Sequence, residues 1–221
     1  MREHPVITES EHTCAAATLP PAFLSELKPV LGRKAWGLLS LWCCYVRLGR
    51  ERNEKEIMMA TEVIEYEAAD LHAVGLLALP DGSDQRPGVL VCHEGPGLGN
   101  HVKNVARRIA DELGFVAFAV DYIGNGEVLA GMDDVMARLG PLMGDPLQTR
   151  ALGQAGLDIL TAHERVDTTR LAAIGYCFGG TMALELARGG ADLRAVVGFH
   201  SGLSTARPED ASNITAKVLV C

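Results

Sequence analysis

The sequence predicts an α/β domain built on a mostly parallel sheet, and three observations point to it. From about residue 61, short apolar runs alternate with amphipathic helical patterns, which is the order of elements in α/β proteins. Most of these runs are apolar throughout, as in strands that are buried on both faces of a sheet. Turn-forming clusters such as Pro80-Asp81-Gly82-Ser83 and Gly124-Asn125-Gly126 separate the elements.

Seven segments have the character of β-strands. The first two are joined by Ala68-Ala69-Asp70, which suits a hairpin connection, and the later ones are short and continuously apolar. In chain order we expect strands over residues 61–66, 72–79, 88–92, 115–120, 171–175, 195–199 and 217–220.

Four segments have helical periodicity. Asn100 is expected to cap the first helix, and Asp145 with Pro146 is expected to open another. Pro141 should end a short helix, because proline removes a backbone donor and clashes with the preceding turn. The four helices are expected over residues 100–113, 131–140, 145–163 and 178–188.

Residues 1–58 differ in character from the rest of the chain. They hold both tryptophans, three of the six cysteines and a charge-rich run over residues 47–55. We therefore expect an N-terminal extension over residues 1–58, poorly ordered or partly helical, followed by the domain over residues 59–221. The apolar stretch 36–46 is shorter than the roughly 20 residues that a membrane span needs, so we expect a short interfacial or buried helix there, and no membrane partner.

Composition excludes some functions. The chain of 221 residues is 48% hydrophobic, enough for one domain with a sizeable core. Its formal net charge of −8 leaves no basic excess for nucleic-acid phosphates. The six cysteines form no C-x-x-C pair and no metal-ligand spacing, which favours free thiols in a reducing compartment. We expect a cytoplasmic monomer without a metal or an organic cofactor.

Residues 175–180 read Gly-Tyr-Cys-Phe-Gly-Gly between an apolar run and a helical pattern. This is a cysteine version of the G-x-S-x-G nucleophile elbow, in which a sharp strand-to-helix turn needs glycine on both sides. Cys177 is the expected nucleophile, because the N-terminus of the following helix favours a thiolate. The N–H of Phe178 would supply half of an oxyanion hole. The alternative is a tight turn in which Cys177 only packs.

A second functional loop, the glycine-rich loop over residues 93–99, follows the strand predicted over residues 88–92. In α/β-hydrolases this loop faces the nucleophile, so the N–H of Gly95 is the expected second oxyanion donor, and its glycine spacing matches neither a P-loop nor a dinucleotide fingerprint. Glu94 is a candidate site residue, whereas His93 is more simply interpreted as solvent-facing or structurally paired. His200, after residues 195–199, could line the same pocket; as a base it is disfavoured, because the usual base comes from a later loop.

The elbow around Cys177, Glu94 on its glycine-rich loop and the opening hairpin ending at Leu79-Pro80 resemble the dienelactone hydrolase family, over about residues 59–221. The resemblance implies an α/β-hydrolase fold and a Cys–His–Asp triad that cleaves a lactone or ester through a thioester acyl-enzyme. It also implies that Glu94 contacts the resting thiol, which turns toward the histidine when substrate binds.

The chain departs from the family pattern in two ways. Members that cleave dienelactone carry an arginine that binds the substrate carboxylate, soon after an Asp-x-Tyr sequence that follows their fourth strand. The matching strand here is the one predicted over residues 115–120, and residues 121–126 contain no arginine. The family's acid and histidine follow the strand that matches residues 217–220, where one further residue is given. We therefore expect a fold that lacks its last strand and helix, and a hydrolase impaired by loss of the triad Asp and His.

Two other functions stay open at this point. One is a non-catalytic α/β-hydrolase-like domain that binds a ligand or a partner, which the missing acid and histidine favour. The other is a reactive-thiol sensor based on Cys177, which the absence of a nearby partner cysteine disfavours. The preferred hypothesis is a hydrolase of small carboxylic esters or lactones.

Overall fold

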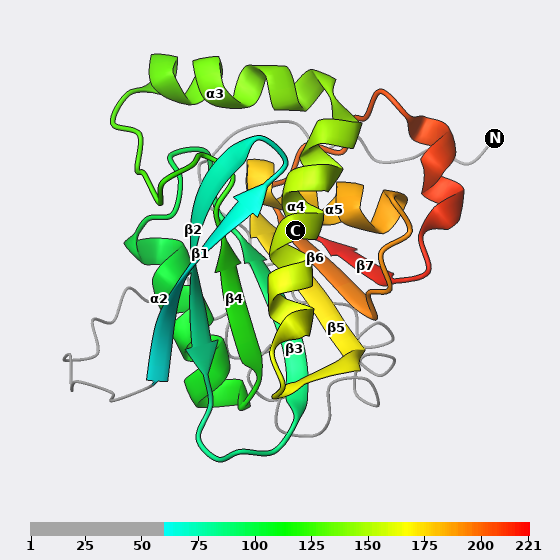
Figure 1. Ribbon diagram of the computed structural model, residues 1–221. Coiled ribbons are helices and arrows are strands. Elements are labelled where there is room, and N and C mark those ends of the chain that lie inside the picture. The colour runs from blue at the N-terminus through cyan, green and yellow to red at the C-terminus, as the bar shows by residue number, and fades with distance from the viewer. Residues whose placement is uncertain (1–59) are drawn as a thin grey trace, which may run out of the picture. The chain divides into compact units, whose positions relative to one another are not determined.

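The computed structural model describes residues 60–221, so the predicted extension over residues 1–58 lies outside the described residues. The described residues form a seven-stranded sheet in the order β1-β2-β4-β3-β5-β6-β7, with helices on both sides (Figure 1). All seven predicted strands are present. Their bounds are β1 Ala60–Ala68, β2 Leu71–Leu79, β3 Arg86–Cys92, β4 Val116–Val120, β5 Val166–Tyr176, β6 Ala195–Phe199 and β7 Lys217–Val220.

The sheet is parallel from β4 through β7, and only the first two strands break this pattern. β1 and β2 form an antiparallel hairpin, and β2 then runs antiparallel to β4. The neighbouring pairs β4–β3, β3–β5, β5–β6 and β6–β7 are parallel. The predicted α/β architecture with a mostly parallel sheet is therefore confirmed.

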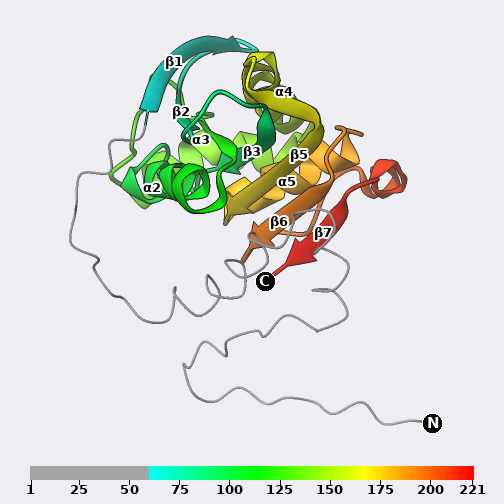
Figure 2. The same cartoon turned by 90° about the horizontal axis from the view of Figure 1, so that it is seen from below.

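Helices cover the two faces of the sheet. α2 and the π-helical turn η1 pack on β2, β3 and β4, while α4 and α5 pack against each other and on the central strands. Figures 1 and 2 show α2 on one face and α4 with α5 on the other. The bounds are α2 Asn100–Arg108, η1 Ile109–Leu113, α3 Met132–Gly144, α4 Pro146–Ala162, α5 Phe178–Arg188 and the 3-10 helix η2 Pro208–Asn213.

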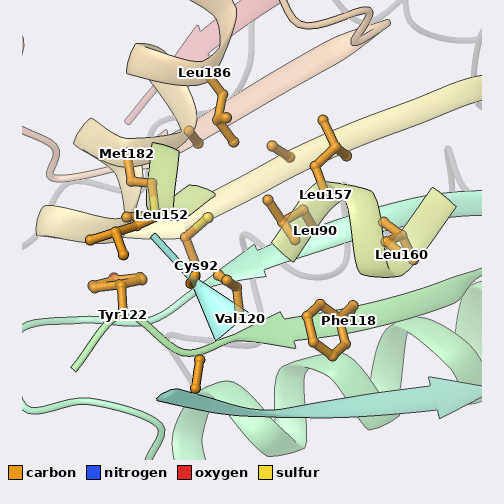
Figure 3. Packing of buried hydrophobic residues seen from close by; sticks show 14 of the residues in the cluster. Leu90, Cys92, Phe118, Val120, Tyr122, Leu152, Leu157, Leu160, Met182 and Leu186 are labelled. Atoms are coloured by element: carbon orange, nitrogen blue, oxygen red, sulfur yellow. The ribbon is translucent and has the colours of Figure 1, made fainter. Parts of the chain in front are cut away.

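The larger core lies between the sheet and the helices α4 and α5. Figure 3 shows Leu90 and Phe118 of the sheet beside Leu157 and Leu160 of α4. Leu90, Phe118 and Leu160 are wholly buried, and burial of one such side chain stabilises the fold by about 1.5–3 kcal/mol. This packing holds the strands in register and so fixes the edge of the sheet at which the functional loops emerge.

Two helix boundaries differ from the sequence prediction. Asn100 is not the cap: Gly99 holds that position in extended backbone, and no side chain bonds the end of α2. Pro141 does not end its helix either, because α3 continues to Gly144. The carbonyl that Pro141 leaves without a helical partner belongs to Ala137, which is exposed, so water can hydrate it and the usual penalty is reduced.

The start of α4 agrees with the prediction. The Asp145 carboxylate accepts hydrogen bonds from the N–H groups of Leu147 and Gln148, both at 3.0 Å, and Pro146 occupies the first turn. Such a cap contributes about 0.5–2 kcal/mol. Within residues 60–221, no helix is both long and apolar enough to cross a bilayer.

Candidate active site

Cys177 lies at a sharp turn between the end of β5 and the start of α5. Its backbone angles are φ 54° and ψ −119°, a strained conformation for a residue with a side chain. Its N–H donates to the carbonyl oxygen of Phe199 at the end of β6, 2.9 Å away. The thiol is partly exposed. The predicted strand–turn–helix geometry at Cys177 is therefore present.

The glycines on both sides of Cys177 allow this turn for a steric reason. A Cβ at Gly175 would collide with the backbone of Gly179 and Gly180, and a Cβ at Gly179 would collide with the carbonyl groups of Cys92 and His93. The first contact lies within the turn, between its two sides, and the second packs the turn against the end of β3. The motif thus serves both local turn geometry and long-range packing.

The register of the sheet brings the glycine-rich loop beside the elbow. β3 and β5 are parallel neighbours, and Cys92 pairs with Gly175 at their ends. Glu94 and Gly95 follow Cys92 by two and three residues, so they leave the sheet next to the turn that carries Cys177. The predicted proximity of this loop to the elbow is confirmed.

Helix α3 supports the glycine-rich loop from outside the sheet. A Cβ at Gly95 would lie 2.9 Å from Cγ1 of Val135 and 3.7 Å from Cδ1 of Leu139, and both side chains are buried. Figure 1 shows α3 extending across one end of the sheet. Because α3 approaches Gly95 so closely, a larger residue at this position would displace either the loop or the helix.

His93 is a buried structural residue rather than an exposed one. Its Nδ1 donates to the carbonyl oxygen of Glu94 at 2.6 Å, and its ring stacks on Tyr122 with centroids 3.6 Å apart. Burial lowers the pKa of His93 to about 4, so the imidazole is neutral near pH 7. Its Nε2 is buried and has no hydrogen-bond partner among residues 60–221.

Tyr122 connects the ends of β3 and β4 with the start of α5. Its hydroxyl donates to the carbonyl oxygen of His93, and its ring centroid lies 5.7 Å from that of Phe178. Burial raises the pKa of Tyr122 well above its usual value, and the acidic groups around it, Cys92 first and then Glu94, Cys177 and Asp121, raise it further.

Asp121 shapes the loop that follows β4. Its buried carboxylate accepts four backbone N–H bonds of 2.8 to 3.0 Å from Val74, Ile123, Gly124 and Gly126. A carboxylate with four donors is well satisfied despite its burial. Asp121 thus acts as a structural anchor for residues 121–126, which contain no arginine.

Glu94 has a partner that the sequence did not predict. Nδ1 of His101, in the first turn of α2, donates to the two carboxylate oxygens at 3.2 and 3.3 Å. The Glu94 side chain is 29% exposed and that of His101 is 54% exposed. The contact between Glu94 and the resting thiol that the resemblance implies is not among the hydrogen bonds of residues 60–221, and it stays a prediction.

His101 and Tyr176 are residues that sequence reasoning missed. The two rings meet edge to face with centroids 4.7 Å apart, and Tyr176 stacks on Phe199 at 5.0 Å. The apolar periodicity of residues 100–113 predicts only the buried face of this helix, and His101 lies outside that face. The available signal was that His101 lies seven residues after Glu94, at the start of the helix that the glycine-rich loop leads into.

The remaining candidates occupy the same end of the sheet. Phe178 is the first residue of α5, so its N–H has no acceptor within the helix. His200 is exposed, has φ 40°, and its N–H donates to the carbonyl oxygen of Cys221 at 2.7 Å. Within the described range, no three His, Cys, Asp or Glu side chains are placed to hold a metal ion.

Comparison with known proteins gives consistent matches. The profile of the dienelactone hydrolase family matches residues 74–221. The solved protein m3DLH is 46% identical with a TM-score of 0.70, over 74% of this chain and 68% of its own. A dienelactone hydrolase-like promiscuous phosphotriesterase from metagenomic libraries is 41% identical, with the same TM-score and coverage.

One curated relative has a more specific name. A probable 2-oxo-3-(5-oxofuran-2-ylidene)propanoate lactonase from Bradyrhizobium sp is 31% identical over 149 residues, which are 64% of this chain. The match spans 58% of the length of that relative.

Proposed function

Because the chain belongs to the dienelactone hydrolase family, a family of hydrolases of lactones and esters, we propose that it acts on small esters or lactones through the thiol of Cys177. The observation that carries the proposal is the conformation of Cys177, at φ 54° and ψ −119° between β5 and α5. Strain of this kind persists only where the surrounding structure enforces it, and it is concentrated at functional sites.

The proposed reaction has two steps. The Cys177 thiolate attacks the acyl carbon, a C–S bond forms, and the carbonyl electrons move to the oxygen. Collapse of this intermediate breaks the bond to the leaving oxygen, which takes up a proton and departs as an alcohol, or stays attached when the substrate is a lactone. Water then cleaves the thioester, releasing the carboxylic acid and restoring the thiol.

Two backbone donors are proposed to stabilise the oxyanion. The N–H of Phe178 at the start of α5 is the first, and the N–H of Gly95 in the neighbouring loop is the second. The support for this assignment is the pairing of Cys92 with Gly175, which sets the two segments side by side. Loss of one such donor typically lowers kcat by about 10²–10³-fold.

The substrate is proposed to be neutral at the position where dienelactone carries its carboxylate. Residues 121–126 contain no arginine, and the carboxylates of Glu94 and Asp121 would repel an anion at this edge of the sheet. A phosphotriester is a second candidate, because a relative that is 41% identical is named a promiscuous phosphotriesterase. Such triesters are neutral as well.

The decisive experiment follows acylation of the thiol. The full chain is mixed with p-nitrophenyl acetate; p-nitrophenol release is measured, and the acetylated residue is identified by peptide mass spectrometry. We expect an acetyl group on Cys177 in the wild type and none in Cys177→Ala. Cys221→Ser removes an exposed thiol and is the matched control, which should acylate like the wild type.

Acylation is measured directly because it does not depend on turnover. No hydrogen bond of residues 60–221 joins a histidine to the Cys177 sulfur, so we expect thioester hydrolysis to be the slower step in the chain as given. Neutral and carboxylated lactones, and a neutral phosphotriester, are then compared as competitors of acylation. Preference for the carboxylated lactone would contradict the proposed substrate class.

The other hypotheses predict different results. A binding domain without catalytic function would show no acetyl transfer to Cys177 at any pH, although ligands could still raise its melting temperature. A redox sensor would form a sulfenic acid at Cys177 with peroxide while the ester left the thiol unmodified. Either result would overturn the proposed hydrolase.

A further inference from the structure

We propose that His101 is a positioning residue of the thiol site, which holds the Glu94 carboxylate beside the elbow and offsets its charge, so that Cys177 is more reactive. The inference rests on the proposed function of Cys177 as a nucleophile and extends it to a residue outside the motif. It is carried by the position of Glu94 relative to Cys177 and by the contacts of His101.

Glu94 and Cys177 emerge at the same edge of the sheet. Cys92 of β3 pairs with Gly175 of β5 in parallel register. Glu94 follows Cys92 by two residues and Cys177 follows Gly175 by two residues, so both leave neighbouring strands at the same level. A Cβ at Gly179 would collide with the carbonyl oxygen of His93, the residue before Glu94, so the start of this loop packs against the elbow. A carboxylate beside a thiol disfavours the thiolate by repulsion between like charges.

His101 holds the Glu94 carboxylate in place. Nδ1 of His101 donates to both of its oxygens, at 3.2 and 3.3 Å. The ring of His101 lies edge-on against Tyr176, the residue before Cys177, with centroids 4.7 Å apart. His101 is therefore held on two sides, by the loop after β3 and by the end of β5. Its first-turn position in α2 ties the carboxylate to the helix.

His101 also reduces the effect of the negative charge of Glu94. A protonated His101 cancels the charge of Glu94 at the distance of an ion pair, and a neutral His101 still orients the carboxylate by its N–H bond. Without His101, the carboxylate would be unpaired and free to approach the sulfur. Titratable and charged groups facing this pair from the surrounding elements are Tyr176 of β5, Arg108 of α2, Tyr122 after β4 and Cys177 at α5.

The test measures how fast the Cys177 thiol reacts with iodoacetamide, an uncharged probe. Full-length wild type, His101→Ala, Glu94→Gln and the double variant are alkylated between pH 5.5 and 9, and labelling at Cys177 is quantified by peptide mass spectrometry. We expect His101→Ala to slow alkylation at pH 7 by about three- to tenfold, since one unit in a thiol's ionisation midpoint corresponds to tenfold. Glu94→Gln should accelerate it.

The double variant distinguishes positioning from a general structural effect. If His101 acts through Glu94, removing His101 has no further effect once Glu94 is an amide, and the double variant alkylates like Glu94→Gln. The proposal is overturned if His101→Ala slows alkylation equally in both backgrounds, or if it has no effect in the wild-type background. His101→Gln, which can donate a hydrogen bond but carries no charge, should fall between wild type and His101→Ala.

The chain offers a matched control. His72 and Glu67, in the β1–β2 hairpin, form another exposed histidine–glutamate pair, with Nδ1 and Oε1 3.1 Å apart. His72→Ala should leave the alkylation of Cys177 unchanged. His101 is exposed enough for alanine to be tolerated, and circular dichroism verifies folding; if His101→Ala is destabilised, the comparison of His101→Gln with its Glu94→Gln double variant decides instead.

This test is independent of hydrolysis. If Cys177 is never acylated by an ester but its alkylation depends on His101 only through Glu94, the proposed function fails and the positioning role stands. If Cys177 is acylated but the effects of His101→Ala and Glu94→Gln on alkylation are independent, the proposed function stands and the positioning role of His101 fails.

Discussion

The ring of Tyr122 stacks on the imidazole of His93 with centroids 3.6 Å apart, and its hydroxyl donates to the His93 carbonyl oxygen. One side chain from the end of β4 thereby fixes both the side chain and the backbone of the residue that precedes Glu94. The proposed oxyanion donor Gly95 follows in the same loop. The geometry of the site thus depends on a buried contact between residues 29 positions apart.

Tyr122→Phe tests this dependence. The variant leaves the buried carbonyl of His93 without its donor, which should lower the free energy of unfolding by about 1–3 kcal/mol. It should also slow acylation of Cys177 by roughly tenfold, or about 1.4 kcal/mol of barrier, because the loop is less well placed. Urea denaturation and the p-nitrophenyl acetate assay measure the two effects.

A second buried tyrosine gives the control for Tyr122→Phe. The hydroxyl of Tyr66 bonds the backbone of Asp121 at 3.1 Å, and no hydrogen bond within residues 60–221 joins it to the loop after β3. Tyr66→Phe should lower stability while leaving acylation close to wild type. Equal losses of activity in both variants would show that stability alone explains the effect.

The two thiols at the ends of β3 and β5 should differ in reactivity. Burial raises the pKa of Cys92 to about 12, so its reactive thiolate is scarce at neutral pH. Cys177 is partly exposed at the start of a helix. We expect iodoacetamide to label Cys177 faster than Cys92 by at least about 100-fold at pH 8, measured by peptide mass spectrometry. Faster labelling of Cys92 would refute the assignment of the elbow.

Buried His93 should make the fold sensitive to acid. Its pKa in the folded state is about 4, below the ordinary value of 6.5. Between these values the unfolded chain binds a proton that the folded chain does not, so stability falls as the pH is lowered from about 6.5 toward 4. The contribution of His93 to this loss is about 2–3 kcal/mol by pH 4.5.

His93→Gln removes the titrating ring, and the comparison isolates its contribution. Urea denaturation at pH 7 and pH 4.5 should show a smaller loss of stability in His93→Gln than in the wild type, by about 2–3 kcal/mol. His72→Gln changes an exposed histidine and should follow the wild type. An unchanged pH dependence in His93→Gln would mean that His93 binds its proton equally well in the folded and unfolded states, so that burial does not lower its pKa.

A buried ion-pair network connects α4 and α5. Arg150 donates to Glu185 with Nε and Nη2, at 3.0 and 2.8 Å, and Arg188 donates to the other oxygen at 2.7 Å. The Glu185 side chain is only 3% exposed. Arg150→Met leaves this carboxylate with fewer partners, and we expect a loss of about 3 kcal/mol of stability.

Arg170→Met serves as the control for the network. Arg170 pairs with Asp167 on the surface, where its side chain is 50% exposed, and such pairs contribute little. Thermal and urea denaturation should separate the two variants clearly. Similar small effects in both would indicate that Arg188 alone satisfies Glu185.

Strand positions and the elbow could be predicted because their signals are local. The apolar runs fixed the seven strands, and the glycines around Cys177 predicted the turn, since each depends on residues adjacent in the chain. The predicted end of α3 was wrong because it depends on more than neighbouring residues. Pro141 predicts a helix end, but Ala137, whose carbonyl it leaves unpaired, is exposed to solvent. That exposure depends on tertiary packing, and it removes much of the free-energy cost of proline within the helix.

By itself, the sequence determined the α/β architecture, the nucleophile candidate Cys177 and the loop that carries Glu94 and Gly95. Only the tertiary structure decided what surrounds them: His93 buried against Tyr122, and the Glu94 carboxylate held by His101. Such contacts depend on strand register and on the approach of α2 to the end of β5, which arise from packing across the whole sheet. No periodicity or motif of neighbouring residues encodes the partner of a single carboxylate.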